Sequence, residues 1–153
     1  NGEICIRGEM GISLMQGYWK RPDATGEAVI DGWYHTGDWG YVDPDGWLFF
    51  VDRRNDLIKR NGESVASGEI ENLLRQIPEV SDAAVVGVRN LIRGQDIHAF
   101  LTLHPGKDLS PDSVLEFCRQ RLSSFKVPNE VRIIDELPRG EYGKVNKELL
   151  KTL

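Results

Sequence analysis

Three segments of the chain carry residue types that could bind a ligand or take part in a reaction. In the first, GWYHTGDWG at 32–40, Asp38 follows a Thr-Gly pair in what the sequence predicts to be a tight turn. A carboxylate in that position can accept two hydrogen bonds from a vicinal diol, and the glycine lets the backbone approach a ligand closely. The alternative is that Asp38 caps its own turn, as loop aspartates often do.

The second segment, DRRNDLIKRNGESVASGEIE, contains an arginine, a turn and two glutamates. Arg53 ends a predicted strand at the boundary between a turn-rich segment and a segment of mixed strand and helix patterns. A guanidinium at that boundary could bind a ribose or a phosphate. The dipeptide Asn61-Gly62 predicts a turn, and its backbone could instead lie flat against a narrow ligand. For Glu69 and Glu71 we favour helix capping, because both fall near the start of a predicted helix.

The third segment, LPRGEYGKVNK at 137–147, places a lysine beside two glycines. Gly140 and Gly143 predict a flexible, exposed loop with Lys144 at its far side. A lysine in such a loop is most often simply solvated, so Lys144 alone indicates no chemistry. The order and spacing of the three segments on one chain carry more weight than any one of them.

The composition excludes several classes of function. The net charge of −5 argues against nucleic acid as the main partner, and no apolar run approaches the roughly 20 residues of a membrane-spanning helix. Two distant cysteines and three scattered histidines predict neither a disulfide framework nor a metal site, and suggest reduced, cytoplasmic thiols. The chain starts at Asn1 and enters a predicted strand at once, so we expect an excerpt of a longer protein. A local basic run is interpreted as a solvated face: Arg53, Arg54, Lys59 and Arg60.

The chain has two parts with different residue patterns, and together they predict a mixed α+β fold. Residues 1–53 are rich in turn signals and aromatic residues and predict a β-rich piece. Residues 54–153 mix strands with helices capped by Ser67 and by Ser110-Pro111, which predicts a compact α+β domain. The strands predicted over the whole chain are 3–7, 46–53, 56–60, 83–88, 97–103 and 131–134, and a last helix is predicted to begin near Val145.

Four motifs in this order resemble the ANL superfamily of adenylate-forming enzymes: GEICIRG, WYHTGD, DRRNDLIKRNGESV with its EIE, and LPRGEYGKVNK. That superfamily comprises acyl-CoA synthetases, the adenylation domains of peptide synthetases, and beetle luciferases. The resemblance covers essentially the whole chain. The runs FFVDRRNDLIKR and SSFKVP are most similar to acyl-CoA ligases of the crotonobetaine/carnitine type.

The resemblance implies a role for individual residues in the first part of the chain. Asp38 matches the aspartate that holds the ribose hydroxyls of ATP, and Arg53 matches the arginine that joins it. Tyr34 and Thr36 flank that nucleotide site. Asn55 falls at the hinge about which the C-terminal lid rotates, a position that is usually Asp or Lys.

It also implies roles for the second part. Lys144 matches the catalytic lysine of adenylation. Gly62 matches the glycine that lines the pantetheine tunnel, with Asn61 in place of the usual second glycine; asparagine tolerates the left-handed backbone. Phe125 and Lys126 lie where relatives contact the nucleotide of CoA, although two neighbouring basic positions are Val127 and Asn129 here.

The implied activity is that of an acid–CoA ligase that forms AMP and pyrophosphate from ATP, with Mg²⁺ and coenzyme A, on a short- or medium-chain or carnitine-like carboxylic acid. Residues 1–53 would end the N-terminal adenylation body and residues 54–153 would form the lid. The phosphate loop and acyl pocket would lie upstream, so the fragment alone is expected to be inactive. Two alternatives stay open: a non-catalytic lid or interaction module, and an adenylation domain that loads a carrier protein.

Overall fold

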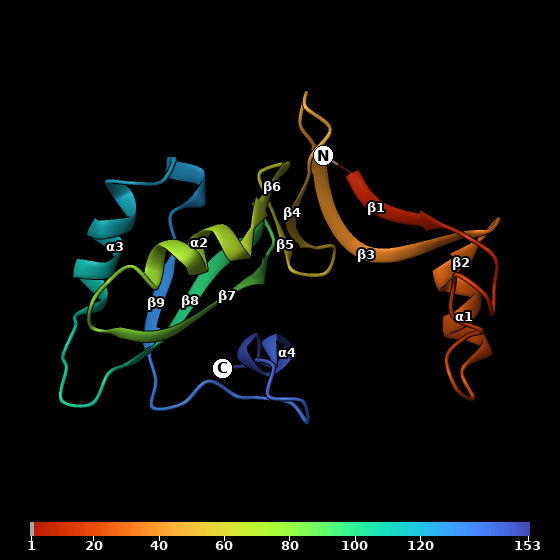
Figure 1. Cartoon of the computed structure of the whole chain (residues 1–153). Coiled ribbons are helices and arrows are strands. Elements are labelled where there is room, and N and C mark those ends of the chain that lie inside the picture. The colour runs from red at the N-terminus through yellow and green to blue at the C-terminus, as the bar shows by residue number, and fades with distance from the viewer. Residues whose placement is uncertain (1) are drawn as a thin grey trace. The chain divides into compact units, whose positions relative to one another are not determined.

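The computed structural model describes residues 2–153 and divides the chain into two compact units. The first unit ends at Asn55 and the second runs from Asp56 to Leu153. This division lies two residues beyond the expected boundary after Arg53. Both units combine strands with short helices (Figure 1), so the expected α+β class is confirmed.

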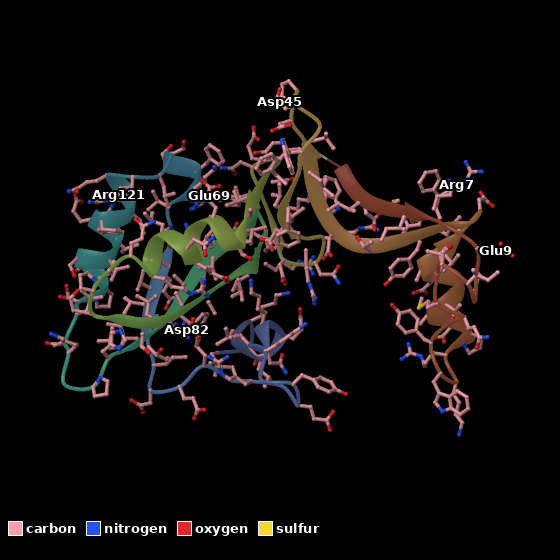
Figure 2. All side chains as sticks on the ribbon, viewed as in Figure 1. Arg7, Glu9, Asp45, Glu69, Asp82 and Arg121 are labelled. Carbon is pink, nitrogen blue, oxygen red and sulfur yellow. The ribbon has the colours of Figure 1, made fainter. Side chains whose placement is uncertain are left out.

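A long central strand organises the first unit. Strand β3 (Trp33–Val42) pairs with β1 (Gly2–Arg7) along one edge, and with β2 (Val29–Ile30) and β4 (Leu48–Arg53) at the two ends of the other edge. All three pairings are antiparallel. Figure 2 shows Asp45 at the tip of the turn that joins β3 to β4.

Helix α1 (Pro22–Ala28) also belongs to the first unit, and the sequence did not predict it. Pro22 stands at the start and Asp23 in the first turn, which are helix-start signals. However, none of the helix residues is buried. Without a buried face the sequence has no 3.6-residue apolar period, and the prediction of a segment without helical character was therefore wrong.

The second unit contains a five-stranded sheet with helices on it. Its strands run in the order β6-β5-β8-β7, and β9 pairs with β8 in parallel while the other pairings are antiparallel. The strands are β5 (Leu57–Arg60), β6 (Glu63–Ala66), β7 (Val80–Asn90), β8 (Gly94–Leu103) and β9 (Glu130–Ile133). The helices are α2 (Ser67–Leu74), α3 (Pro111–Arg119), the 3₁₀ turn η1 (Ser124–Lys126) and α4 (Lys147–Leu150).

Both faces of this sheet are covered. The larger core cluster gathers Ile70 and Leu74 of α2 and Val114 and Cys118 of α3 against one face of the strands. The smaller cluster packs Leu150 of α4, with Leu137 and Phe100 among others, against the other face. Neighbouring residues of β7 and β8 contribute to opposite clusters, as the two-residue period of a strand requires. None of the helices in residues 2–153 has the length and apolar character that a membrane span requires.

Helix α2 protects the free edge of strand β7. A carboxylate oxygen of Glu71 accepts a hydrogen bond from the Val85 amide at 2.9 Å, and the Arg75 guanidinium donates to the Ala83 carbonyl at 2.7 Å. These bonds satisfy backbone groups that an edge strand leaves unpaired. Glu71 lies outside the first turn of α2, so its expected role as a helix cap was wrong.

The predicted cap of α2 was also wrong. Ala66 occupies the cap position, and no side chain caps the helix. Ser67 is the first helical residue and is fully buried, with its hydroxyl accepting a hydrogen bond from Lys147 at 2.7 Å. In α3 the prediction was right: the Ser110 hydroxyl accepts from the Ser113 amide, and Pro111 begins the helix.

Candidate functional site

Asp38 and Arg53 face each other across strands β3 and β4 of the first unit. They are register partners at the end of β4, and Nε of Arg53 lies 3.8 Å from Oδ1 of Asp38. Both side chains are accessible, with 39% of Asp38 and 61% of Arg53 exposed. A carboxylate and a guanidinium in this position offer acceptors and donors to one polar ligand.

The segment that carries Asp38 is a bulge within β3, and the prediction of a tight Thr-Gly-Asp turn was wrong. Between the register pairs Cys5–His35 and Glu3–Trp39, three residues of β3 stand opposite one residue of β1. The Thr36 hydroxyl donates to the Ile4 carbonyl at 2.7 Å and accepts from the Asp38 amide at 3.1 Å. Thr36 therefore holds the bulge that carries Asp38. A hydroxyl suits this position because it both donates and accepts a hydrogen bond.

Gly37 completes the bulge with a backbone conformation that other residues rarely adopt. Its φ is 75°, in the left-handed region that favours glycine. Its amide donates to Oε1 of Glu3 at 3.1 Å, and its carbonyl accepts from the Arg54 amide at 2.7 Å. The Gly37 amide is thus tied to β1 and its carbonyl to the residue that follows β4, and these two bonds hold the backbone next to Asp38.

Tyr34 belongs to the same end of the first unit. Its hydroxyl lies 3.4 Å from that of Tyr18. The hydrogen bond to Tyr18 raises the pKa of Tyr34 above its ordinary value, with burial and the nearby Asp38 carboxylate adding to the shift. The structure thus brings Tyr34, Thr36, Asp38 and Arg53, the four residues expected at the nucleotide, onto strands β3 and β4.

A donor set that the sequence spacing missed lies beside the bulge. Atoms of Glu3, Cys5 and His35 that could hold a metal ion lie within 4.8 Å of one another. The pairing of β1 with β3 brings these residues together, because it makes Cys5 and His35 register partners. Nδ1 of His35 is 3.1 Å from Oε2 of Glu3, and this hydrogen bond holds the pKa of Glu3 below its ordinary value. The hydrogen bonds to His35 and to Gly37 occupy the Glu3 carboxylate without a metal.

Lys144 lies in a small hairpin of the second unit. Arg139 and Val145 form an isolated antiparallel bridge, and the Gly140 amide donates to the Lys144 carbonyl at 2.9 Å. The Arg139 guanidinium donates to the Gly143 carbonyl at 2.8 Å. The Lys144 side chain is exposed, and within residues 2–153 its ammonium has neither an ion pair nor a hydrogen bond.

The Arg139 side chain also fastens this hairpin to the sheet. Its guanidinium donates to Oδ2 of Asp82 on β7 at 2.7 Å. Burial and hydrogen bonds act in opposite directions on Asp82, and its bonds to the Ala83 amide, Arg75 and Arg139 leave its pKa below the ordinary value. The backbone around Lys144 is therefore held while its ammonium stays available.

Asn61 and Gly62 form the turn between β5 and β6, as the sequence predicted. Their φ values are 51° and 84°, both in the left-handed region, which is the pattern of a two-residue hairpin turn. The Asn61 amide donates to the Arg93 carbonyl at 2.8 Å. Both residues are exposed, and an added Cβ on Gly62 would meet no atom within 4 Å. The turn offers a backbone surface open to a ligand.

Phe125 and Lys126 are less available than their expected role suggests. The Phe125 side chain packs against the larger core cluster. Nζ of Lys126 lies 2.7 Å from both carboxylate oxygens of Glu69, so its charge is already paired. Binding of an anionic group by Lys126 would have to compete with Glu69.

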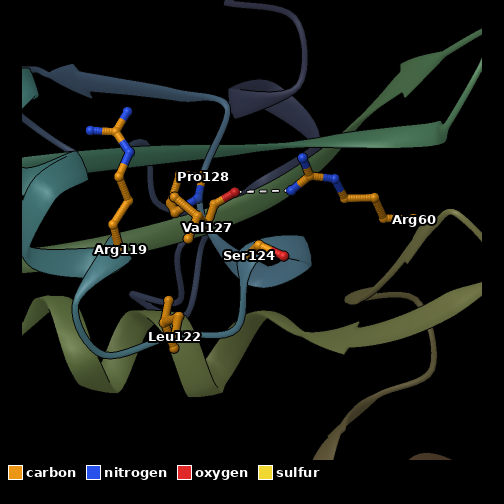
Figure 3. A pocket seen from close by; sticks show the side chains of 6 residues that line it. All are labelled: Arg60, Arg119, Leu122, Ser124, Val127 and Pro128. Carbon is orange, nitrogen blue, oxygen red and sulfur yellow. Dashed lines mark hydrogen bonds between the residues drawn. The ribbon is translucent and has the colours of Figure 1, made fainter.

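A pocket of about 390 Å³ opens next to these residues (Figure 3). Six residues line it: Arg60, Arg119, Leu122, Ser124, Val127 and Pro128. Arg60 is only 8% exposed and donates through one nitrogen to the carbonyls of Phe125 and Val127, both at 2.9 Å. Its interpretation as part of a solvated face was wrong, because these carbonyls draw the guanidinium inward.

Comparisons with known proteins identify relatives of this chain. Residues 69–144 match the model of the AMP-binding enzyme C-terminal domain. The chain is 47% identical over 98% of its length to a crotonobetaine/carnitine–CoA ligase of Proteus mirabilis, and 44% identical to one of Salmonella typhimurium. Its structure is also similar to that of the o-succinylbenzoate-CoA synthetase MenE of Bacillus subtilis, which was solved with its acyl-adenylate. That superposition covers 98% of the chain, with a TM-score of 0.88 and 36% sequence identity. The chain belongs to the ANL superfamily.

The chain spans only part of these ANL relatives. It covers 29% of the length of both crotonobetaine/carnitine–CoA ligases and 30% of MenE. A further solved relative is the amide bond synthetase McbA of Marinactinospora thermotolerans, with a TM-score of 0.85 and 34% identity over 99% of the chain and 30% of McbA. The second unit contains the residues that match the C-terminal domain, and its mixed fold is that of the ANL lid.

The sequence predicted neither the burial of Arg60 nor the ion pair between Glu71 and Lys147 in this ANL chain. Lys147 ends the segment LPRGEYGKVNK, and its partner is remote in the sequence. Its Nζ lies 2.8 Å from Oε1 of Glu71, which is 76 positions earlier in the chain. No local pattern signals a contact of that separation.

Proposed function

We propose that the chain is the C-terminal part of an ATP-dependent acid–CoA ligase that works through an acyl-adenylate. Sequence identity of 44–47% to crotonobetaine/carnitine–CoA ligases supports a CoA ligase. The structural likeness to MenE, a CoA synthetase solved with an acyl-adenylate, supports the intermediate. The same relatives support a short- or medium-chain or carnitine-like acid as the substrate. The two free cysteines and the use of ATP and CoA support a cytoplasmic location.

The observation that carries the proposal is the state of Lys144. Its ammonium is exposed and unpaired within the described residues, whereas its hairpin is fixed by Arg139 and by the Gly140 amide. A cation that is positioned but unpaired can stabilise negative charge that develops in a transition state. We assign it to the first half-reaction.

In that half-reaction a carboxylate oxygen of the acid attacks the α-phosphorus of ATP. A new phosphorus–oxygen bond forms, the bond to the β-phosphate breaks, and pyrophosphate leaves with the bonding electron pair. Lys144 stabilises the charge on the phosphoryl oxygens more in the transition state than in the ground state, which lowers the barrier. Mg²⁺ accompanies ATP and masks phosphate charge, and no residue of this chain is assigned to it.

Asp38 and Arg53 would hold the ribose of the nucleotide. The two Asp38 oxygens can each accept a hydrogen bond from a ribose hydroxyl, and Arg53 lies on the neighbouring strand with unused donors. Thr36 keeps the bulge in shape and Tyr34 borders the site. The weak 3.8 Å contact between the two charges leaves them free to bind the ligand.

In the second half-reaction the thiol of CoA attacks the acyl carbonyl carbon, a thioester forms, and AMP leaves. We assign the Asn61-Gly62 turn to the pantetheine arm, because its exposed backbone lets a narrow chain approach closely. Phe125 and Lys126, beside the pocket of Figure 3, would face the nucleotide of CoA. Asn55 is the last residue of the first unit, and we assign to it the hinge of the lid. Rotation of the lid about this hinge would withdraw Lys144 from the reacting group and bring the Gly62 turn to it.

The first unit supports the idea that it completes a larger adenylation body. Among the described residues up to Asn55, Leu14 is the one hydrophobic residue that is buried. Large apolar side chains on β2, β3 and β4 are exposed instead, including Ile30, Trp33, Phe49 and Phe50. So many exposed large apolar side chains beside so small a buried core indicate surfaces that a further part of the protein covers. The acyl pocket would lie in that body, so the lid does not determine the acid.

The test uses the chain together with its upstream sequence, and the chain alone as the control. The longer protein is expected to exchange pyrophosphate into ATP only when a suitable carboxylic acid is added, and to form a thioester when CoA is supplied. The chain alone is expected to do neither. Thioester formation on a carrier protein but not on CoA would favour a carrier-loading adenylation domain. Loss of both activities in the longer protein would favour an interaction module.

A further inference from the structure

A partly buried ion-pair network lies three residues beyond Lys144. Nζ of Lys147 is 2.8 Å from Oε1 of Glu71 and 2.7 Å from the hydroxyl of Ser67. Only 18% of the Lys147 side chain and 12% of that of Glu71 are exposed. Oδ2 of Asp56 lies 3.9 Å from Nζ of Lys147 and adds favourable charge to the network. This network joins α4 to the start of the second unit and to α2.

The partners of Lys147 are themselves held by other parts of the second unit. Ser67 is fully buried at the start of α2. Oε1 of Glu71 also accepts from the Val85 amide at 2.9 Å, and its other oxygen lies 3.6 Å from the Arg75 guanidinium. The Glu71 carboxylate thus contacts both the Arg75 guanidinium and a strand amide, and Lys147 pairs with a group that these contacts orient.

The segment that follows Lys144 depends on such anchors. Helix α4 has four residues, which is far too short to be stable by itself in water. Leu150 is buried in the smaller core cluster, and the Asn146 amide donates to the Pro138 carbonyl at 2.7 Å. Lys147 is the charged anchor between the Asn146 and Leu150 contacts.

We infer that Lys147 is a positioning residue for Lys144. Its ion pair with Glu71 and its hydrogen bond to Ser67 hold the Lys144 hairpin at one place on the second unit. This inference rests on the proposed function of Lys144. It assigns to Lys147 no contact with substrate. The physical reason is that a misplacement of about 1 Å in a reacting group can cost about 10²-fold in rate.

The test compares Lys147→Met with Lys147→Arg and with Lys151→Met in the full-length ligase that contains this chain. Lys151 is the matched control, because it lies at the end of the same helix and pairs with the exposed Glu148 at 2.6 Å. Lys147→Met is expected to slow adenylation about 10- to 100-fold, mainly in kcat rather than in KM for ATP. Lys147→Arg is expected to recover part of the rate, and Lys151→Met to behave as the parent protein.

A purely structural role is distinguished by combining variants. If Lys147 acts through Lys144, Lys147→Met lowers adenylation no further once Lys144→Ala is present, because the positioned group is gone. It also leaves the rate of thioester formation from preformed acyl-adenylate within about twofold in the Lys144→Ala background. An independent further loss in either half-reaction would overturn the inference.

Two failures can be told apart. If Lys144→Ala leaves adenylation unchanged, the proposed function of Lys144 is wrong and the inference falls with it. If Lys144→Ala abolishes adenylation but Lys147→Met matches Lys151→Met, only the inference is wrong. Circular dichroism of each variant identifies a change in folding, and Glu71→Gln, which removes the partner's charge but keeps its shape, is expected to reproduce the effect of Lys147→Met.

Discussion

Asp38 and Arg53 are register partners across β3 and β4, with 3.8 Å between Oδ1 and Nε. An exposed pair at this distance contributes at most about 1 kcal/mol to stability and often nothing measurable. The pair therefore adds little to stability, and ligand binding is the better explanation of why the two charged side chains lie opposite each other. The bulge fixed by Thr36 and Gly37 directs the carboxylate.

Replacement of Asp38 by alanine in the full-length ligase is expected to raise the ATP concentration needed for both half-maximal pyrophosphate exchange and overall thioester formation. Each lost charge-assisted hydrogen bond to the ribose costs about 1.5–3 kcal/mol, so at least a tenfold rise is expected. Asp45→Ala, at the tip of the turn that joins β3 to β4 (Figure 2), is the control and should leave the ATP requirement unchanged. Unaltered ATP dependence in Asp38→Ala would refute the nucleotide site.

Local signals in the sequence predicted much of the fold. The Asn61-Gly62 turn, the Ser110 cap and the alternation in β8 each depend on residues close in the chain. Contacts between distant segments could not be predicted in the same way. The bulge at Thr36 depends on pairing with β1, and the burial of Arg60 depends on carbonyls more than sixty positions away.

The candidate site shows the same division between local sequence signals and contacts of distant segments. The resemblance predicts roles for Asp38, Arg53 and Lys144 because their motifs are contiguous stretches of sequence. The place of Glu71 near the start of a predicted helix favours a capping role, which the structure contradicts. Its partner Lys147 lies 76 positions away, and only the folded chain brings the two side chains together.

Gly62→Leu is expected to spare adenylation and to slow thioester formation at least tenfold, because the side chain would obstruct the pantetheine arm. Nothing lies within 4 Å of the added Cβ, so the substitution causes no internal clash. The left-handed backbone still imposes a cost of about 1–2 kcal/mol. Gly46→Leu controls for that strain, because Gly46 has φ 89° and equally open surroundings in the turn that joins β3 to β4. Equal slowing of both half-reactions by Gly62→Leu would contradict the assignment.

Arg60→Met is expected to destabilise the second unit by about 2–4 kcal/mol, because it leaves the carbonyls of Phe125 and Val127 without their donor. Arg119→Met, on the same pocket but exposed, should change stability by no more than about 0.5 kcal/mol. Urea unfolding followed by circular dichroism measures the loss. All four tryptophans lie in the first unit, so their fluorescence reports that unit separately. Similar losses in the two variants would show that Arg60 does not support these carbonyls.

The most direct test of the account is the pair of half-reaction rates for Lys144→Ala in the full-length ligase. Pyrophosphate exchange measures adenylation, and thioester formation from supplied acyl-adenylate and CoA measures the second step. The account predicts that adenylation slows by at least about 10²-fold, the effect of removing one preorganised transition-state donor, while the second step stays largely intact. If both steps slow equally, or neither changes, Lys144 is a solvated hairpin residue and the two-conformation mechanism is contradicted.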